Sequence, residues 1–576
     1  MCGFIGRILG PGARVLPALT AGLPWLAQRG PDAQCEWCSP GGEVELLHAR
    51  LAIVDKTAVA HQPLTAAAHG VTVAFVGEVY NHQEIRKELV DYSFRTNSDT
   101  EILLALYAYY GAAGLSRAKG MVACAIVDTN RRTVLLFRDA VGKKPLFVAR
   151  WAGQVLFGSS LLPLVAVSGA DVETADDAHR RFWRQEFIGP PGSVFKDAES
   201  ALPGEALLFD FSGRLISRTR ITPDTFSTGR VTQHVEARAN LRKMINLSVR
   251  RRLHDNPSPC LLLSGGLDST VVAAAMAEEA RKLGISVRAI TFGAVLPFLN
   301  DEPYARYAAA RLGLPLVTVA PARLFPSSRA IADTCERAVA RQDEPLGMLS
   351  YMLRYQLIEQ AKNHSRIVLT GDGGDEVFLG YSQTSGWIAP PDAPPRSVAG
   401  LCGPPLPQWM SRWGREQNSA SLLGHGLAVL DRASAEQGVE VRCPLLDWDV
   451  MAFARALSPD LLLDGGRSKG LLLGLLEDWP RWFVYRRKRG STVNLRWAWL
   501  TSRFEGLRDM VERSAQERLT ELLPEPLRRP ARQWQTREIF HNFPSAWKLM
   551  VWSAFERRWS EARSSKNRSF LLVNQP

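Results

Sequence analysis

The chain has 576 residues, of which 46% are hydrophobic and 22% charged, and this composition excludes a fibrous or a disordered protein. A single hydrophobic core rarely organises more than about 250–300 residues, so we expect at least two domains. The net charge of +12 permits a nucleic acid or an acidic substrate as partner but requires neither. No apolar run reaches the roughly 18 residues of a membrane-spanning helix, so we expect a cytoplasmic protein without a membrane partner.

The first 150 residues show short β-like runs at 72–75, 123–128 and 134–137, together with a helical stretch at 101–109. This mixture predicts a layered α+β domain, which we place at residues 1–212. The apolar pattern is then lost, and the polar stretch at 213–234 is predicted to be a linker.

From residue 235 onward, strands and helices alternate along the chain. A strand at 260–263 leads through a glycine-rich turn to a helix at 270–282, and a second strand follows at 287–292. This order predicts an α/β domain with a doubly wound parallel sheet over 235–520, whose ligand binds at the carboxyl ends of the strands. We expect a basic helical C-terminal extension over 521–576.

Two later stretches have a distinctive composition. The proline-rich stretch at 388–409 cannot form a continuous helix or a central strand, and both a mobile cover over the site and a passive surface loop are compatible with it. Near the end of the chain, Trp552, Phe555 and Trp559 recur at helical spacing, which predicts an aromatic stripe packed against a neighbour.

The strongest local motif is SGGLDST at 264–270, placed between a buried strand and a helix. Its glycines allow close backbone approach, and the N–H groups of such a turn form a cradle for phosphate at the positive end of the following helix. The Walker pattern GxxxxGK[ST] is absent. The SGGxDS form resembles the PP-loop of ATP pyrophosphatases, which activate a carboxyl or carbonyl group by adenylation and release pyrophosphate.

A second glycine-rich turn, TGDGGDEVF at 370–378, carries the carboxylates Asp372, Asp375 and Glu376. Such crowded carboxylates are usually compensated by Mg²⁺ or by basic partners, so these residues are candidates to order a metal–nucleotide complex; the alternative is a solvated turn. Lys488, inside YRRKRGST, offers a cation for charge that develops on an adenylate and on pyrophosphate, and the alternative is a basic surface run.

At the other end of the chain, Cys2 follows the initiator methionine. Removal of Met1 would expose both the thiol and the α-amine of Cys2, and an α-amine has a pKa near neutrality. A nucleophile and its base would then belong to one residue.

Collected in order, these motifs resemble those of the asparagine synthetase B family over nearly the full chain. The first half carries MCGFIG, QRGPD, HARLAIVD, HQP, GEVYNH and NSDTE, and the second half carries SGGLDST, DEP, GDGGDEVF, EVRCPLLD and YRRKRGST. The resemblance implies a class II glutamine amidotransferase domain, an α+β sandwich of the Ntn-hydrolase type, followed by an α/β PP-loop ATP pyrophosphatase domain.

The resemblance also implies roles for individual residues. Cys2 would attack glutamine, Arg50 and Asp99 would hold its charged ends, Gly77 and Glu78 would line the same pocket, and ammonia would travel inside the protein. Asp372 and Lys488 would assist formation and aminolysis of an acyl-adenylate. The implied ATP site comprises Leu263, Ser264, Gly265, Gly266, Asp268, Ser269, Phe292, Gly371, Asp372 and Gly373, with Asp268 and Asp375 as ligands of Mg²⁺.

Several positions depart from the family pattern. Val76 stands where the family has an Asn that donates a hydrogen bond to the oxyanion, and loss of one such donor typically lowers the rate by about 10²–10³-fold. Met348, Leu353 and Leu473 replace an Asp, a Pro and an Arg near the acceptor pocket. The loss of these polar groups indicates an acceptor that is bulkier or less charged than aspartate.

Two functions therefore remain open. The first is glutamine-dependent amidation of a carboxylate, either aspartate or a specialised acceptor such as a sugar acid. The alternative is a ligase whose substrate supplies its own amine, as in lasso-peptide macrolactam cyclases, which take a peptide, or in β-lactam synthetases. A tRNA-modifying enzyme or a non-catalytic homologue fits less well, so we expect small-molecule substrates and no nucleic acid partner. The resemblance leaves a homodimer open.

Overall fold

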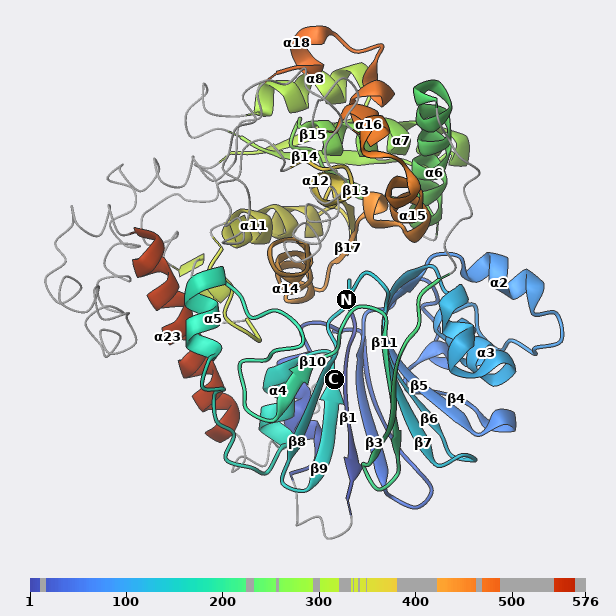
Figure 1. Cartoon of the computed structure of the whole chain (residues 1–576), viewed down its shortest axis with the longest axis vertical. Helices are drawn as coiled ribbons and strands as arrows, with labels where there is room; N and C mark the ends of the chain where they lie inside the picture. Colours follow the sequence, from blue (N-terminus) through green and yellow to red (C-terminus); the bar gives the residue numbers. More distant parts are fainter. Residues whose placement is uncertain are drawn as a thin grey trace, which may run out of the picture.

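The computed structural model describes residues 1–10, 17–223, 233–254, 258–293, 301–320, 333–334, 336–339, 342–348, 350–380, 422–462, 469–486 and 543–564. Within them, two antiparallel sheets form the N-terminal part and a parallel sheet forms the C-terminal part (Figure 1). None of the helices in these ranges is both long and apolar enough to cross a membrane. The proline-rich stretch and Lys488 lie outside the described residues.

The N-terminal part is built from two six-stranded sheets. The first has the order β10-β8-β9-β1-β3-β2 and the second β12-β11-β7-β6-β5-β4. The strands of the first sheet are β1 (Gly3–Leu9), β2 (Ala33–Cys38), β3 (Val44–Arg50), β8 (Phe147–Trp151), β9 (Gln154–Gly158) and β10 (Ala198–Ser200). Those of the second are β4 (Leu64–Ala66), β5 (Val71–Val79), β6 (Gly120–Asp128), β7 (Thr133–Arg138), β11 (Glu205–Asp210) and β12 (Leu215–Arg220).

The two sheets pack face to face, because alternate residues of each strand point inward. Phe4 of β1 and Val76 of β5 belong to the shared inner core, whereas Ile5 of β1 and Phe75 of β5 face outward. Helices α2 (His82–Glu88) and α3 (Thr100–Tyr110) cover the outer face of the second sheet, and α4 (Leu161–Val167) covers that of the first (Figure 1). The first domain is thus the layered α+β structure that the sequence predicts.

The prediction that a linker begins at residue 213 is wrong. Residues 215–220 form β12, which pairs with β11 at the edge of the second sheet, and α6 (His234–Leu253) already begins at the end of the predicted linker. Most side chains of β12 are exposed, so the strand lacks the apolar alternation that would have identified it. The first domain therefore extends at least to Ile221, which is buried against the second sheet.

The C-terminal part contains five parallel strands in the order β15-β14-β13-β16-β17. They are β13 (Cys260–Leu262), β14 (Arg288–Phe292), β15 (Leu316–Val319), β16 (Ile367–Leu369) and β17 (Glu440–Arg442). Helices α6, α7 (Leu267–Leu283), α8 (Glu302–Leu312) and α15 (Trp448–Ala456) pack on one face, and α11 (Ser350–Lys362) and α14 (Val429–Ala435) on the other. Helices on both faces confirm the predicted doubly wound parallel sheet.

The last described helix, α23 (Phe543–Ser564), returns to the first domain and lies beside α4 and α5 (Ala178–Gln185) (Figure 1). The side chains of Trp552 and Phe555 are buried there, and Trp559 packs against the same core, as the aromatic spacing predicts. Remaining short elements are η1 (Leu19–Gly22), α1 (Leu23–Leu26), η2 (Ala58–Ala60), η3 (Ala67–His69), η4 (Gly111–Arg117), α12 (Gly374–Val377), η6 (Leu422–Ala428), η7 (Pro444–Leu446), α16 (Pro459–Leu462), α17 (Gly470–Leu473), η9 (Gly474–Leu476) and α18 (Arg481–Val484).

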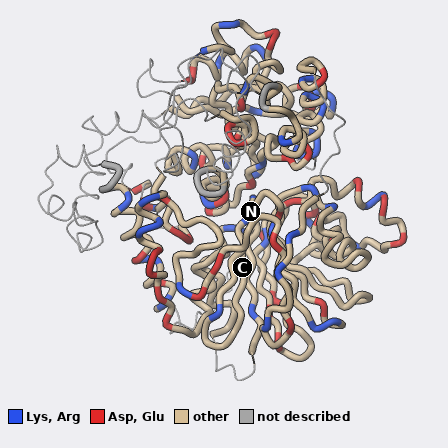
Figure 2. Tube along the Cα trace, in the orientation of Figure 1, with Lys and Arg blue, Asp and Glu red and all other residues tan. Residues whose placement is uncertain are grey.

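Charge is dispersed over this fold. Along the described chain, basic and acidic residues are interspersed over both domains (Figure 2), but α6 carries six basic residues against one acidic residue.

Candidate active sites

Cys2 lies immediately before β1, at the end of the two stacked sheets. Its Sγ accepts a hydrogen bond from the Leu51 amide at 3.2 Å and donates to the Leu51 carbonyl at 3.6 Å. Burial raises the pKa of the thiol, so a nearby base is needed to form the thiolate. The terminal amine of the intact chain is that of Met1, and burial lowers its pKa to about 5. Only removal of Met1 would give Cys2 its own α-amine.

The other residues assigned to glutamine gather around this end of the sheets. Arg50 closes β3, is buried, and donates to the carbonyls of Thr57, at 2.9 Å, and Asp55. Asp99, at the start of α3, accepts from the Val79 amide at 2.8 Å, which ties it to the end of β5. Burial raises the pKa of Asp99. The geometry therefore brings the chain segments of Cys2, Arg50 and Asp99 to one end of the first domain.

Gly77 and Glu78 lie in β5 beside Val76. Gly77 has a φ of 139°, and a Cβ there would lie 1.7 Å from the Met121 carbonyl oxygen, so no other residue fits without a backbone shift. Val76 is fully buried between the two sheets. Its hydrocarbon side chain offers no donor, so the structure supplies no side-chain replacement for an oxyanion hydrogen bond at this position.

Glu78 also reaches across to the second domain. Its carboxylate lies 3.3 Å from the Arg442 guanidinium, and the two side chains are 6% and 1% exposed. Arg442 donates to Glu440 at 2.7 Å and to the Arg252 carbonyl at 2.7 Å, and the Arg252 guanidinium stacks 4.0 Å from the centre of the Tyr80 ring. The motif EVRCPLLD contains Arg442, but nothing in the sequence indicated its partner in β5.

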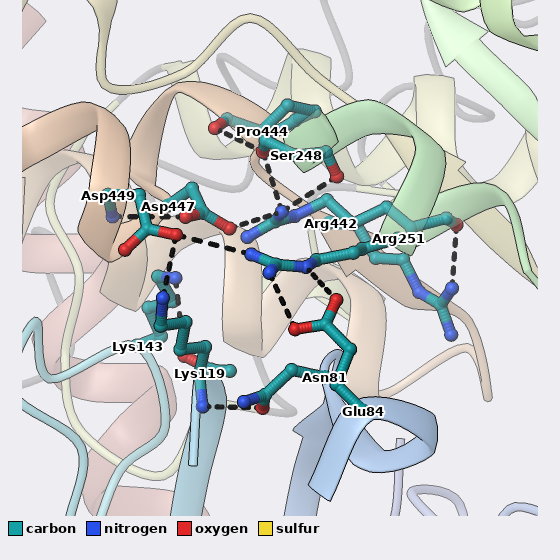
Figure 3. Close-up of polar contacts among 12 residues, drawn as sticks. Asn81, Glu84, Lys119, Lys143, Ser248, Arg251, Arg442, Pro444, Asp447 and Asp449 are labelled. Atoms are coloured by element: carbon teal, nitrogen blue, oxygen red, sulfur yellow. Dashed lines mark hydrogen bonds and ion pairs between the residues drawn. The ribbon is translucent and has the colours of Figure 1, made fainter. Parts of the chain in front are cut away.

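Further ion pairs join the domains around Arg442 (Figure 3). Lys119 of the first domain pairs with Asp449 at 2.9 Å, and Arg251 contacts Glu84 at 2.8 Å and Asp449 at 3.3 Å. Beside them, Arg252 pairs with Asp447 at 2.8 Å. These contacts lie at the start of α15, and they fix the end of the first domain that carries Cys2 against α6 and β17.

The second candidate site is formed by the SGGLDST loop, which follows β13 as predicted. Gly265 has a φ of 79°, and a Cβ there would lie 2.5 Å from the Ala305 amide nitrogen. The hydroxyls of Ser264 and Ser269 lie 2.9 Å apart, and the Gly266 amide donates to Ser264 at 3.2 Å. Helix α7 begins at Leu267, three residues before the predicted start, so the loop lies directly at its positive end.

The GDGGDEVF turn follows β16, the strand next to β13, and it packs directly on the SGGLDST loop. A Cβ on Gly371 would lie 2.5 Å from the Ser269 amide nitrogen, and a Cβ on Gly374 would lie 2.4 Å from Asp268 Cγ. Gly373 has a φ of 96°. Glycines at these positions let the two loops meet, which brings together the predicted ATP-site residues Ser264, Gly265, Gly266, Asp268, Ser269, Gly371, Asp372 and Gly373, with Asp375.

Two other predicted ATP-site residues lie at the rim of this arrangement. The amide of Leu263 donates to the Ile290 carbonyl at 2.8 Å, so this residue extends the pairing of β13 with β14 and its side chain is buried. Phe292 ends β14 and is partly buried against the core. Both residues therefore lie at the carboxyl ends of strands, where a doubly wound sheet binds its ligand.

Two basic residues that sequence reasoning missed contact acidic side chains at this site. Arg354 of α11 contacts both oxygens of Asp372, at 2.6 and 2.8 Å. Burial alone would raise the pKa of Asp372, but this guanidinium holds it below its usual value. Arg486 donates to Asp301 at 2.6 Å and to the Gly265 carbonyl at 2.9 Å. In the sequence, only the basic run that contains Arg486 indicated that a basic side chain would lie at this site.

The predicted metal ligands Asp268 and Asp375 share a third cation. The Lys469 ammonium lies 2.5 Å from an Asp268 oxygen and 2.8 Å from an Asp375 oxygen. No group of three or more His, Cys, Asp or Glu side chains arranged to hold a metal occurs in the described part of the chain. Asp268 and Asp375 would give Mg²⁺ two protein carboxylates, a set that suits Mg²⁺ bound together with phosphate.

A cavity lies between the two sites. Met1, next to Cys2, lines it on one side, and Cys443, whose Sγ is 3.6 Å from the Thr370 hydroxyl, lines it on the other. Charged side chains also line it: Lys143, with a pKa that burial lowers to about 8, and Lys144, which lies 3.5 Å from Asp431. The space between the sites is thus lined by buried charges as well as by apolar groups.

Comparison with known proteins agrees with this arrangement. The family described as glutamine amidotransferase domain matches residues 1–218, and the family described as asparagine synthase matches residues 240–418 and 405–562. The chain is 27% identical over 388 residues to asparagine synthetase [glutamine-hydrolyzing] 1 of Bacillus subtilis, a match that covers 66% of this chain and 59% of that protein.

Two further relatives come from eukaryotes. Amidase chyE of Penicillium rubens is 27% identical over 414 residues, covering 66% of this chain and 59% of that protein. Asparagine synthetase [glutamine-hydrolyzing] 2 of rice is 26% identical over 511 residues, covering 84% and 74%. The chain thus spans about three-fifths of the length of the first two relatives. It belongs to the asparagine synthetase B family, with a glutamine amidotransferase domain followed by an asparagine synthase domain.

Proposed function

We propose that the protein is an ATP-dependent carbon–nitrogen ligase that activates a carboxylate as an acyl-adenylate and converts it to an amide with nitrogen from glutamine. One observation carries this proposal: the SGGLDST loop and the GDGGDEVF turn are in direct contact at the carboxyl ends of adjacent parallel strands. An amide cradle for phosphate and a set of paired carboxylates then face the same space.

The chemistry divides between these two loops. In the proposed reaction, a carboxylate oxygen of the acceptor attacks the α-phosphorus of ATP, and pyrophosphate leaves. The Ser264–Ser269 loop at the start of α7 is suited to hold the departing pyrophosphate, because its amides and the helix dipole both favour anions. Asp372, held ionised by Arg354, would orient the acceptor or its incoming amine. Lys488 remains a predicted catalytic cation.

Glutamine is the proposed nitrogen source. Cys2, immediately before β1, offers a nucleophile, the buried Arg50 a cation and Asp99, at the start of α3, an anion. Together they suit a free amino acid with an amide side chain. The Cys2 thiol would attack the glutamine amide carbon to form a thioester and release ammonia. The relatives from Bacillus subtilis and rice carry glutamine-hydrolyzing in their names, which supports this source.

A second candidate is a ligase whose substrate supplies its own amine. Val76 favours it, because a fully buried valine cannot donate the hydrogen bond that the oxyanion of the thioester-forming step needs.

Exchange of labelled pyrophosphate into ATP, measured with a panel of carboxylates, tests the adenylation step. We expect exchange with at least one acceptor in the wild type, and no exchange in Asp268→Asn. Glutamate formation from glutamine then separates the two candidates. Exchange without any glutamate would favour the internal-amine ligase, whereas an absence of exchange with amino acids, sugar acids and peptides alike would contradict both.

A further inference from the structure

Lys469 occupies the position between the two carboxylates that the ATP site offers to a metal ion. Asp268 comes from the first turn of α7, Asp375 from α12, and Lys469 from the residue before α17, so three separate chain segments converge. Its ammonium lies 2.5 Å from Asp268 and 2.8 Å from Asp375. One cation therefore already contacts both carboxylates.

The fold is shaped to hold Lys469 in this place. Lys469 is buried and has a φ of 59°, a conformation that residues other than glycine seldom adopt. Gly380 leaves the space that its stem and Asp375 occupy: a Cβ on Gly380 would lie 2.3 Å from Lys469 Cε and 2.1 Å from Asp375 Oδ1. A lysine held in a strained backbone conformation beside a small residue is a specific feature of this site.

The same two carboxylates fit Mg²⁺ when it arrives with a nucleotide. Mg²⁺ usually binds proteins through one or two carboxylates and completes its shell with phosphate oxygens and water. Asp268 and Asp375 are close enough to share one cation, and the Ser264 and Ser269 hydroxyls lie in the same loop as Asp268. Without a triphosphate, water alone would have to complete the octahedral shell of the ion.

We propose that Lys469 excludes free divalent metal from the empty site and admits it only together with ATP. A bare Mg²⁺ that approached Asp268 and Asp375 would meet the ammonium at contact distance, and the repulsion would be strong because the site is largely buried. A triphosphate gives the ammonium a new anionic partner, so metal and nucleotide bind cooperatively. This inference rests on the proposed function in that ATP is the substrate.

The coupling can be measured on the whole protein with Mn²⁺ as the probe, since electron spin resonance reports the free ion directly. Without nucleotide, we expect Lys469→Met to bind one Mn²⁺ with a Kd at least about tenfold lower than the wild type, within the range of typical coupling between sites. With ATP present, the same variant should bind nucleotide more weakly, because the phosphates have lost a cation.

Lys282 provides a matched control. Its ammonium also bridges two carboxylates, Glu278 at 2.6 Å and Glu279 at 2.7 Å, but on the surface of α7. Lys282→Met should leave Mn²⁺ binding as in the wild type. Adding Asp375→Asn to Lys469→Met should remove the gain, which would locate the ion between the two carboxylates.

Equal Mn²⁺ affinity in the wild type and in Lys469→Met would overturn the inference. If the methionine variant does not melt like the wild type, Lys469→Gln gives the same comparison, because it removes the charge while keeping a hydrogen-bond donor. Failure of the proposed function would give a different result. In that case neither the wild type nor any of the variants would bind Mn²⁺ together with ATP.

Discussion

The two candidate sites differ in how their charges are paired. At the candidate glutamine site, Glu78 and Arg442 are 6% and 1% exposed, and they join two domains. At the candidate ATP site, Arg354 and Asp372 are 28% and 18% exposed and lie between a helix and a loop of the same domain. A pair sealed in an interface is closed to a ligand, whereas a partly exposed pair can exchange one partner for a ligand. The first pair is thus suited to fixed geometry and the second to exchange.

The largest expected effect comes from breaking the sealed pair. Arg442→Met would leave Glu78 and Glu440 buried without their shared cation, which typically costs about 3–5 kcal/mol. Urea denaturation would measure this loss in the free energy of unfolding. Arg366→Met is the matched control, since Arg366 also pairs across the domains, with Asp32 at 2.7 Å, but is 53% exposed; it should lose at most about 1 kcal/mol. Equal losses would contradict the comparison.

The second effect concerns Val76. If the missing oxyanion donor limits glutamine hydrolysis, Val76→Asn should raise the rate of glutamate formation, by up to about 10²-fold. Steady-state assays with glutamine alone would show it, with Val73→Asn on the same strand as a control for polar substitution. A well-folded Val76→Asn protein with an unchanged rate would mean that another group limits the pocket.

A pH dependence is expected from Glu344, buried between the domains and paired with Arg432 at 3.0 Å. Burial raises the pKa of Glu344 to about 7, above the value near 4.5 that holds when the chain is unfolded. The protonated form is then favoured by folding, so this contribution to stability is fully present below about pH 4.5 and is lost as the pH rises through about 7.

Glu344→Gln should therefore flatten the stability profile between pH 5 and 8, by an amount on the order of 1–3 kcal/mol. The midpoints of urea denaturation at each pH would measure it. A wild-type profile that is already flat across this range would show that Arg432 keeps Glu344 ionised.

The smallest effect is expected at the partly exposed pair of Arg354 and Asp372. Arg354→Lys keeps the charge beside Asp372 but loses the two-point contact, so we expect about a tenfold fall in kcat/KM for the carboxylate in pyrophosphate exchange. The KM for ATP should change less than that for the carboxylate, because Asp372 is proposed to orient the acceptor whereas the Ser264–Ser269 loop is proposed to hold the pyrophosphate. An equal loss for both substrates would assign Arg354 a structural role.

Local signals predicted much of this molecule. The SGGLDST loop, its strand and its helix were foreseen because glycines, hydroxyls and apolar runs lie within a few residues of one another. The edge strand β12 was missed because its exposed polar residues carry no alternation. Arg442 and Lys469 were missed as partners of Glu78 and Asp268 because those pairs join distant parts of the chain, and no sequence period encodes such a contact.

Glutamate formation from glutamine, compared between the wild type and Cys2→Ala, tests the proposed nitrogen source most directly. The proposed function predicts glutamate release by the wild type, stimulated when ATP and an acceptor are present, and none above background in the variant. Equal rates in the two proteins, alongside normal pyrophosphate exchange, would contradict it and assign the amine to the substrate.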